Sequence, residues 1–99
     1  MSIQKSYFLL HIEESFQIRG RDVWVVSGKI QHGKIHDTSS VVILNTVGEI
    51  IRETKVLNID WFGRGKYKSV VAEEGDTIAV IFDIKERKYL DKGNYLAIL

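Results

Sequence analysis

The fold is decided by the stretch FQIRGRDVWVVSGKIQHGKIHD, residues 16–37. Its runs of valine, isoleucine and aromatic residues are interrupted by Gly20, Gly28 and Gly33. Short β-branched runs broken by glycine are typical of β-strands joined by tight turns. The stretch contains no nucleophile motif, metal-ligand cluster or phosphate-binding loop. We therefore expect its role to be architectural.

The glycines and polar residues of this stretch predict where the chain turns. Gly20 is expected to end one strand, and residues 21–22 to form a polar corner. Gly28 is expected to relieve crowding, or to bend a long strand where the sheet curves. We expect residues 31–34 to make the next hairpin turn. Further turns are predicted at Gly48, Gly63, Gly65, Gly75 and Gly93.

The same strand signal recurs along the whole chain. The expected strands are 7–12, 16–19, 23–31, 41–44, 54–62, 67–72, 77–84 and 95–99. Alternation places Phe8, Leu10 and Ile12 on one face of the first strand. It likewise places Leu57, Ile59 and Trp61 on one face of a later strand. Residues 77–84 are apolar almost throughout, which indicates a strand covered on both sides, and helical periodicity is nowhere sustained.

Many short strands with tight connections predict an all-β fold, a closed or nearly closed antiparallel β-barrel. Closure removes the unpaired strand edges that would otherwise aggregate. The length of 99 residues suits one continuous core. We therefore expect a single β-barrel domain over residues 1–99.

Composition restricts the chemistry further. The formal net charge is +1, so the chain as a whole carries no basic field of the kind that marks many nucleic-acid-binding proteins. The chain has no cysteine, which excludes disulfides and cysteine catalysis and fits a reducing compartment. The apolar run near the start is too short for a signal peptide or a membrane span. We expect a cytoplasmic protein that does not associate with a membrane.

Three ordered segments resemble a known family. The pattern F-x-I-x-G-R, an apolar run, and then S-G-K-I-x-x-G-K-I in residues 16–35 resembles the second domain of elongation factor Tu and related translational GTPases. Residues 72–77, AEEGDT, look like the family's A-x-x-G-D-N turn. Residues 90–97, LDKGNYLA, look like its closing R-G-x-V-L-A element. The resemblance covers the chain from about Tyr7 to Leu99 and implies the same β-barrel.

The resemblance also implies a binding role. In relatives the second domain holds the aminoacylated 3′ end of tRNA, or contacts ribosomal RNA and protein. The positions that match the tRNA-end pocket are Glu13, Glu14, Phe16, Ile18, Gly20 and Asp60. The chain departs from the family pattern at Asp22, which replaces the second glycine of G-R-G, and at Thr77, which replaces the usual asparagine.

Nucleotide-binding and dinucleotide-binding motifs do not fit this sequence. The GTP site of elongation factor Tu lies in a separate domain that is marked by G-x-x-x-x-G-K-[ST]. Here Gly65 and Lys66 are followed by Tyr67, and Asp60 stands where the first glycine is required. The pair Gly63 and Gly65 likewise lacks the third glycine of a dinucleotide fingerprint. We expect no GTPase activity, no nucleotide and no cofactor.

One basic segment is a candidate phosphate contact. Arg64, Lys66 and Lys68 alternate around Tyr67, so in a strand they would project from one face toward successive phosphates. Neighbouring aromatic residues at 61, 62 and 67 could stack on bases. The alternative reading is an exposed hairpin whose lysines keep an edge soluble.

Other polar clusters have simpler explanations. Mixed charges around Lys85, Arg87, Lys88 and Lys92 are typical of a solvated loop. The acidic pairs at 13–14 and 73–74 put adjacent side chains on opposite faces of a strand, so neither pair forms a catalytic dyad. His32, His36 and Asp37 have metal-ligand chemistry, but their spacing suits a helix and this segment is not helical. Ser39 and Ser40 lack a nucleophile motif.

Two hypotheses follow from the sequence. The first is a non-catalytic binding module that engages RNA, either a tRNA 3′ end or ribosomal RNA. The alternative is a protein-interaction or accessory module that docks a partner or self-associates through a barrel face or an open strand edge. Its anchors would be Trp24, Trp61 and Phe62. An enzyme is not supported, because no coherent nucleophile, acid–base pair or metal set is present.

Overall fold

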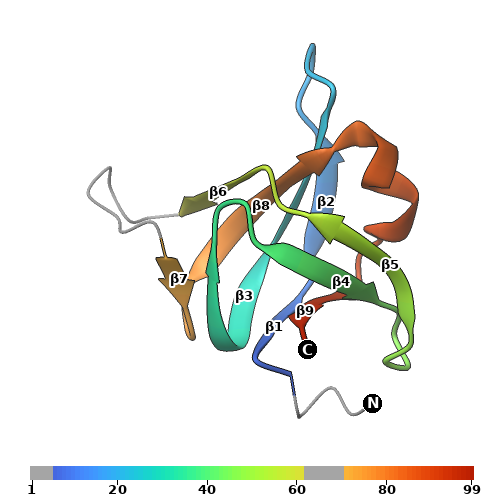
Figure 1. Cartoon of the computed structure of the whole chain (residues 1–99). Helices are drawn as coiled ribbons and strands as arrows, with labels where there is room; N and C mark the ends of the chain where they lie inside the picture. Colours follow the sequence, from blue (N-terminus) through green and yellow to red (C-terminus); the bar gives the residue numbers. More distant parts are fainter. Residues whose placement is uncertain (1–5, 62–70) are drawn as a thin grey trace.

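The structure is a computed structural model that describes residues 6–61 and 71–99. Its elements in chain order are β1 (Phe8–His11), β2 (Glu14–Gln17), β3 (Val23–His36), β4 (Ser40–Leu44), β5 (Ile50–Lys55), β6 (Asn58–Trp61), β7 (Val71–Glu73), β8 (Thr77–Asp83), the 3-10 helix η2 (Ile84–Tyr89) and β9 (Tyr95–Ile98). Figure 1 shows these strands curled around a common interior, with η2 at one side. The all-β antiparallel fold predicted from the sequence is confirmed.

The long strand β3 organises the sheet. The strands are ordered β5-β4-β9-β1-β3-β8-β6, while β2 and β7 pair with further parts of β3. One edge of β3 therefore pairs with β1 and β2, and the other pairs with β8 and β7, in each case antiparallel. Because a single 14-residue strand belongs to both halves of the curled sheet, the two halves are held in a fixed relation.

The curled sheet is nearly closed by the chain itself. β5 and β6 lie at the two ends of the strand order but follow each other in the sequence. At the crossing, the Val56 N–H donates to the Ser39 carbonyl over 2.9 Å, and the Leu57 N–H donates to the Ile81 carbonyl over 2.8 Å. Two consecutive residues thus join opposite edges of the sheet.

The interior of the curled sheet is one apolar core. It includes the fully buried side chains of Phe8, Phe82, Leu10, Ile12 and Leu96. Phe8, Leu10 and Ile12 come from alternate positions of the first strand region, as predicted from the alternation. β8 also matches its prediction, since five of its seven residues are buried or half-buried apolar side chains. Burial of this apolar area is the main favourable term in folding.

Two expectations about the chain path are wrong. Residues 31–34 do not form a hairpin turn, because β3 continues through them to His36. Gly33 does have a positive φ of +84°, but it lies within β3 opposite Phe8, where an added Cβ would overlap the Tyr7 carbonyl oxygen. Residues 54–62 are not one strand either. β5 ends at Lys55 and β6 begins at Asn58, and Leu57 between them is 50% exposed while Ile59 is buried.

Two elements were not predicted. Residues 50–53 of β5 lie before the strand that was predicted to begin at residue 54, and the 3-10 helix η2 is too short to give a periodic pattern. The remaining boundaries agree within a few residues. Turn glycines at 20, 48, 75 and 93 all have positive φ, as expected. The predicted strand 67–72 and the turns at Gly63 and Gly65 lie largely or wholly outside the described residues.

Substitution of Gly28 tests the close contact between β1 and β3. A Cβ at this position would overlap the backbone oxygen of His11 and lie 3.1 Å from a Leu10 methyl carbon. Backbone atoms cannot move aside cheaply, so we expect Gly28→Ala to lower the free energy of unfolding by about 3 kcal/mol. The measurement is urea denaturation followed by tryptophan fluorescence.

Gly20→Ala is the matched control. Gly20 has a φ of +79° but has no neighbour within 4 Å of an added Cβ, so only the backbone conformation is penalised, by about 1 kcal/mol. A Gly28→Ala variant as stable as the Gly20→Ala variant would contradict the steric explanation.

Candidate nucleic-acid interface

The strand register brings three of the predicted site residues onto one face of the sheet. Glu14 of β2 pairs with Ser27 of β3, Ser27 with Ala79 of β8, and Ala79 with Asp60 of β6. Directly paired residues in an antiparallel sheet project to the same side. Glu14 and Asp60 therefore share a face, three strand spacings or about 14 Å apart.

The neighbouring row is apolar. Phe16 pairs with Val25, Val25 with Ile81, and Ile81 with Asn58. Phe16 is 45% exposed, whereas Val25 is buried and Ile81 half-buried. Alternate residues on β3 and β8, such as Val26 and Phe82, point instead into the core. The face that carries Glu14, Phe16 and Asp60 thus lies outside the core, with an apolar strip flanked by carboxylates; we refer to it as the β2–β6 face.

The other predicted pocket residues lie next to β2. Glu13 is exposed just before the strand, where its N–H donates to the Ser27 carbonyl over 2.8 Å. Ile18 follows the strand and is half-buried, and its carbonyl accepts from the Arg21 N–H over 3.1 Å. Gly20 lies in the turn with its left-handed backbone. All three positions are therefore next to β2 or on the hairpin that β2 forms with β3.

The hairpin tip carries two cations that the sequence reasoning did not select. Arg19 and Arg21 are both exposed on either side of Gly20, and Figure 1 shows this hairpin projecting from the body of the barrel. The Gln17 side chain donates to the Arg21 carbonyl over 3.2 Å, which braces the turn. Two arginines on either side of a turn glycine form a local positive charge, which the net charge of +1 for the whole chain does not reveal.

Part of the predicted site cannot be placed. Arg64, Lys66 and Lys68, together with Phe62 and Tyr67, lie outside the described residues. Trp24, an anchor of the alternative hypothesis, is only partly exposed and packs against the core from β3.

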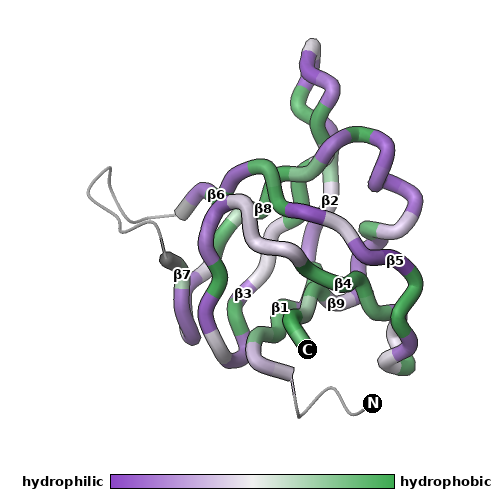
Figure 2. Tube along the Cα trace, in the orientation of Figure 1, coloured by the Kyte–Doolittle hydropathy of each residue, from purple (hydrophilic) through white to green (hydrophobic). Residues whose placement is uncertain are grey.

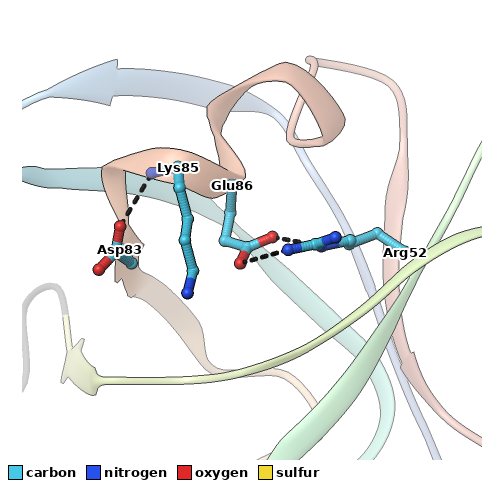
Figure 3. Close-up of polar contacts among 4 residues, drawn as sticks. All are labelled: Arg52, Asp83, Lys85 and Glu86. Carbon is cyan, nitrogen blue, oxygen red and sulfur yellow. Dashed lines mark hydrogen bonds and ion pairs between the residues drawn. The ribbon is translucent and has the colours of Figure 1, made fainter.

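An ion pair joins η2 to the neighbouring strand β5. Figure 3 shows Arg52 of β5 reaching Glu86, with Asp83 and Lys85 at the start of the helix. The guanidinium Nε and a terminal nitrogen donate to the two Glu86 oxygens over 2.8 and 3.3 Å. The hydrogen bond and the charge of Glu86 raise the pKa of Arg52 above its ordinary value. Arg52 also lies over the Tyr89 ring, 5.0 Å from its centroid.

The remaining polar clusters have structural roles. The His32 ring nitrogen lies 2.9 Å from both the hydroxyl and the carbonyl of Ser6, and His36 contacts the carbonyl of Asp37 over 2.9 Å. In the described part of the chain, no three His, Asp or Glu side chains form a group that could hold a metal ion. The Asp83 carboxylate caps η2 by accepting from the Lys85 N–H.

The helix η2 has six residues. Across residues 6–61 and 71–99 there is no helix with the length and apolar character needed to cross a bilayer.

This geometry is that of a β-barrel domain of the translation-factor type, and comparisons with known proteins agree. No family model matches the chain. It is 32% identical over 91 residues to elongation factor Tu of the apicoplast of Plasmodium falciparum, a match that covers 92% of this chain and 21% of that protein. Two structures of translation elongation factor SelB from Methanococcus maripaludis, one without ligand and one with the GTP analogue GppNHp, each give a TM-score of 0.67 at 26% identity. Each of these matches covers 95% of this chain and 19% of SelB.

The chain is homologous to elongation factor Tu and has the fold of a β-barrel domain of translational GTPases. It spans about a fifth of the length of these relatives. The resemblance inferred from the sequence motifs is therefore confirmed, and the similarity falls on a barrel rather than on a nucleotide-binding domain.

Removal of Arg52 tests the closure of the barrel by η2. The Glu86 side chain is only 3% exposed, so in Arg52→Ala its carboxylate would be buried without its partner. We expect a lower melting temperature for Arg52→Ala, and a substantial recovery when Glu86→Leu is added to it. Thermal unfolding followed by circular dichroism gives the comparison.

Lys29→Ala, a change at an exposed cation of β3, is the control and is expected to leave the melting temperature nearly unchanged. Equal melting temperatures for Arg52→Ala and Lys29→Ala would show that the ion pair does not hold η2 in place.

Proposed function

We propose that this protein is a non-catalytic RNA-binding module of the translation machinery, and that its β2–β6 face receives a single-stranded RNA end such as the 3′ end of tRNA. The observation that carries the proposal is the meeting of Glu14, Phe16 and Asp60 on one face, from strands far apart in the sequence. Homology to an elongation factor supports a role in translation.

The chemistry of the face suits the sugar and base of an RNA end. The half-exposed ring of Phe16 offers a stacking surface, and stacking of a base on an aromatic side chain contributes about 1–3 kcal/mol. Val25 and Ile81 extend this apolar strip. Carboxylates accept hydrogen bonds from a ribose 2′-hydroxyl, which is the group that distinguishes RNA from DNA. The carboxylates of Glu14 and Asp60 would act in this way.

Phosphates require cations. Arg19 and Arg21 lie on the hairpin between β2 and β3, next to the β2–β6 face. We propose Arg64, Lys66 and Lys68, which lie outside the described residues, as further phosphate contacts. A strand of RNA lying across the sheet would then meet acidic and aromatic groups at its end and basic groups along its backbone. Ribosomal RNA is the other RNA that this arrangement would accept.

The proposal assigns no reaction, cofactor or nucleotide to this chain. The GTP analogue in one SelB structure belongs to a protein of which this chain covers 19%. We propose that residues 1–99 act as one binding domain, in a compartment that synthesises protein. For the apicoplast relative that compartment is an organelle, and for this chain we propose the cytoplasm.

Phe16→Ala tests the face directly. Loss of a stacked base should raise the dissociation constant for RNA about 10-fold, the equivalent of about 1.4 kcal/mol. The measurement is a fluorescence-anisotropy titration of total tRNA and of a short single-stranded RNA. Val47→Ala, at a 76% exposed side chain in the β4–β5 turn, is the matched control and should bind as the unaltered protein does.

Salt provides a second readout of the same titration. Binding of RNA phosphates releases counterions, so the logarithm of the affinity should fall linearly as the logarithm of the salt concentration rises. Absence of RNA binding at low salt, or equal affinities for Phe16→Ala and the unaltered protein, would refute the proposed function.

A further inference from the structure

The sheet β5-β4-β9-β1 is apolar on both of its faces. One face packs on the core. The opposite face carries a second cluster, in which Leu9, Leu44 and Ala97 are buried beneath Val42, Tyr95 and Leu99. Figure 2 shows the apolar colouring along β4 and at the C-terminal end of the chain. An antiparallel sheet exposed to water on one side normally alternates apolar and polar residues, so this second face has the composition of a covered surface.

Exposed apolar side chains surround this second face. Tyr7 and Val47 are each 76% exposed, and Ile50 is 52% exposed. A hollow is lined from β4, β5 and β9 by Val42, Ile50, Ala97 and Leu99, with Glu53 and Lys55 at its side. We call this surface the β1–β5 face. It combines an apolar floor with one carboxylate and one ammonium group.

The register divides the β1–β5 face into two rows. The first row runs Leu9, Ala97, Val42 and Glu53, each residue paired with the next across neighbouring strands. In the second row Ser40 pairs with Lys55, and continuing the β4–β9 register two residues beyond Val42 and Ala97 adds Leu99. Tyr7 lies in a bend just before β1, and its N–H donates to the Ile98 carbonyl over 2.6 Å, so Tyr7 is next to the end of this row but outside the strand register. Between the two rows lie residues that point into the core: Phe8, Ile98, Val41 and Thr54.

We propose that a second copy of this chain covers the β1–β5 face, in a two-fold symmetric dimer. The two-fold axis would lie midway between the two packed sheets and would run perpendicular to the strands. It would pass over the residues between the two rows, which include Val41 and Thr54. The first row of one copy then faces the second row of its partner, and the reverse. Two sheets of the same twist pack in this way with their strands about 30° apart.

The two rows are complementary in size and in charge. Lys55 of one copy would face Glu53 of the other, and the pair occurs twice because of the symmetry. Leu99 would lie over the small side chain of Ala97. A self-complementary surface of this kind is the requirement for a closed two-fold interface.

The charges of Glu53 and Lys55 favour this axis over the two parallel axes that pass over one row or the other. An axis over the row of Leu9 and Glu53 would place Glu53 of one copy opposite Glu53 of its partner. An axis over the row of Leu99 and Lys55 would do the same with Lys55. Like charges placed opposite one another are destabilising. Of these three parallel axes, the intermediate one alone pairs opposite charges.

The dimer would be reversible. The axes of the four strands span three strand spacings, about 14 Å, so we expect the face to be smaller than the roughly 800 Å² per partner of a standard stable interface. We therefore expect monomer and dimer to exchange with protein concentration. The β2–β6 face lies on the other half of the sheet, so dimerisation and RNA binding are independent claims.

Charge reversal tests the dimer. In the Glu53→Lys variant, the ammonium group introduced at position 53 would face Lys55 of the partner. In the Lys55→Glu variant, the carboxylate introduced at position 55 would face Glu53 of the partner. Each like-charge contact occurs twice because of the symmetry. Each single variant should raise the dimer dissociation constant about 10-fold or more, as measured by sedimentation equilibrium. An equimolar mixture of the two variants should dimerise again, because the ammonium group introduced at position 53 of one chain then faces the carboxylate introduced at position 55 of the other. Val42→Lys, which places a charge within the apolar floor, should be monomeric.

Lys29→Glu is the matched control, because it makes the same change of charge at an exposed position of β3 outside this face and should dimerise like the unaltered protein. Circular dichroism establishes that each variant is folded. A protein that stays monomeric at every concentration, or a dimer that the two single charge reversals leave unchanged, would overturn the proposal.

Discussion

The close approach of the β1 backbone to β3 is the constraint on which the rest of the structure depends. Gly28 and Gly33 have no side chain, and β1 together with the residues beside it occupies the space where Cβ atoms would lie. This contact lets one continuous strand pair with β1 and β2 on one edge and with β8 and β7 on the other. The sheet can therefore curl around one core and present two outer faces in fixed positions.

These two faces differ in chemistry although they belong to one curled sheet. The β2–β6 face carries Phe16 in the row next to the one that contains Glu14 and Asp60, a combination of stacking surface and hydrogen-bond acceptors. The β1–β5 face has an apolar floor around Ala97 with Glu53 and Lys55 at its side. The interior core of the barrel is filled by other residues than those of these two outer faces. The outer faces are therefore where we place binding.

Much of the fold could be predicted from sequence, because strand alternation and turn glycines are local signals. The first strand, β8 and the turn at Gly20 were found in this way. The prediction of a turn at residues 31–34 was wrong because the sequence shows only that a glycine is present. It does not distinguish a glycine required for close backbone approach, such as Gly33, from a turn glycine. The break in the predicted strand 54–62 was missed because Val56 and Leu57 are as apolar as their neighbours.

Less of the candidate site could be predicted. Family resemblance selected Glu14, Phe16 and Asp60, but only the pairing of four strands places them on one face. The pair of Arg52 and Glu86 joins residues 34 positions apart, which no local pattern reveals.

The most direct test of the central claim, that the β2–β6 face is the RNA-binding surface, is a two-dimensional ¹H–¹⁵N NMR titration of the protein with a short single-stranded RNA. The account predicts that amide signals of Glu14, Phe16, Val25 and Asp60 shift together, while those of Val42 and Ala97 on the opposite half do not. Shifts confined to the β1–β5 face, or no shifts at all, would contradict it.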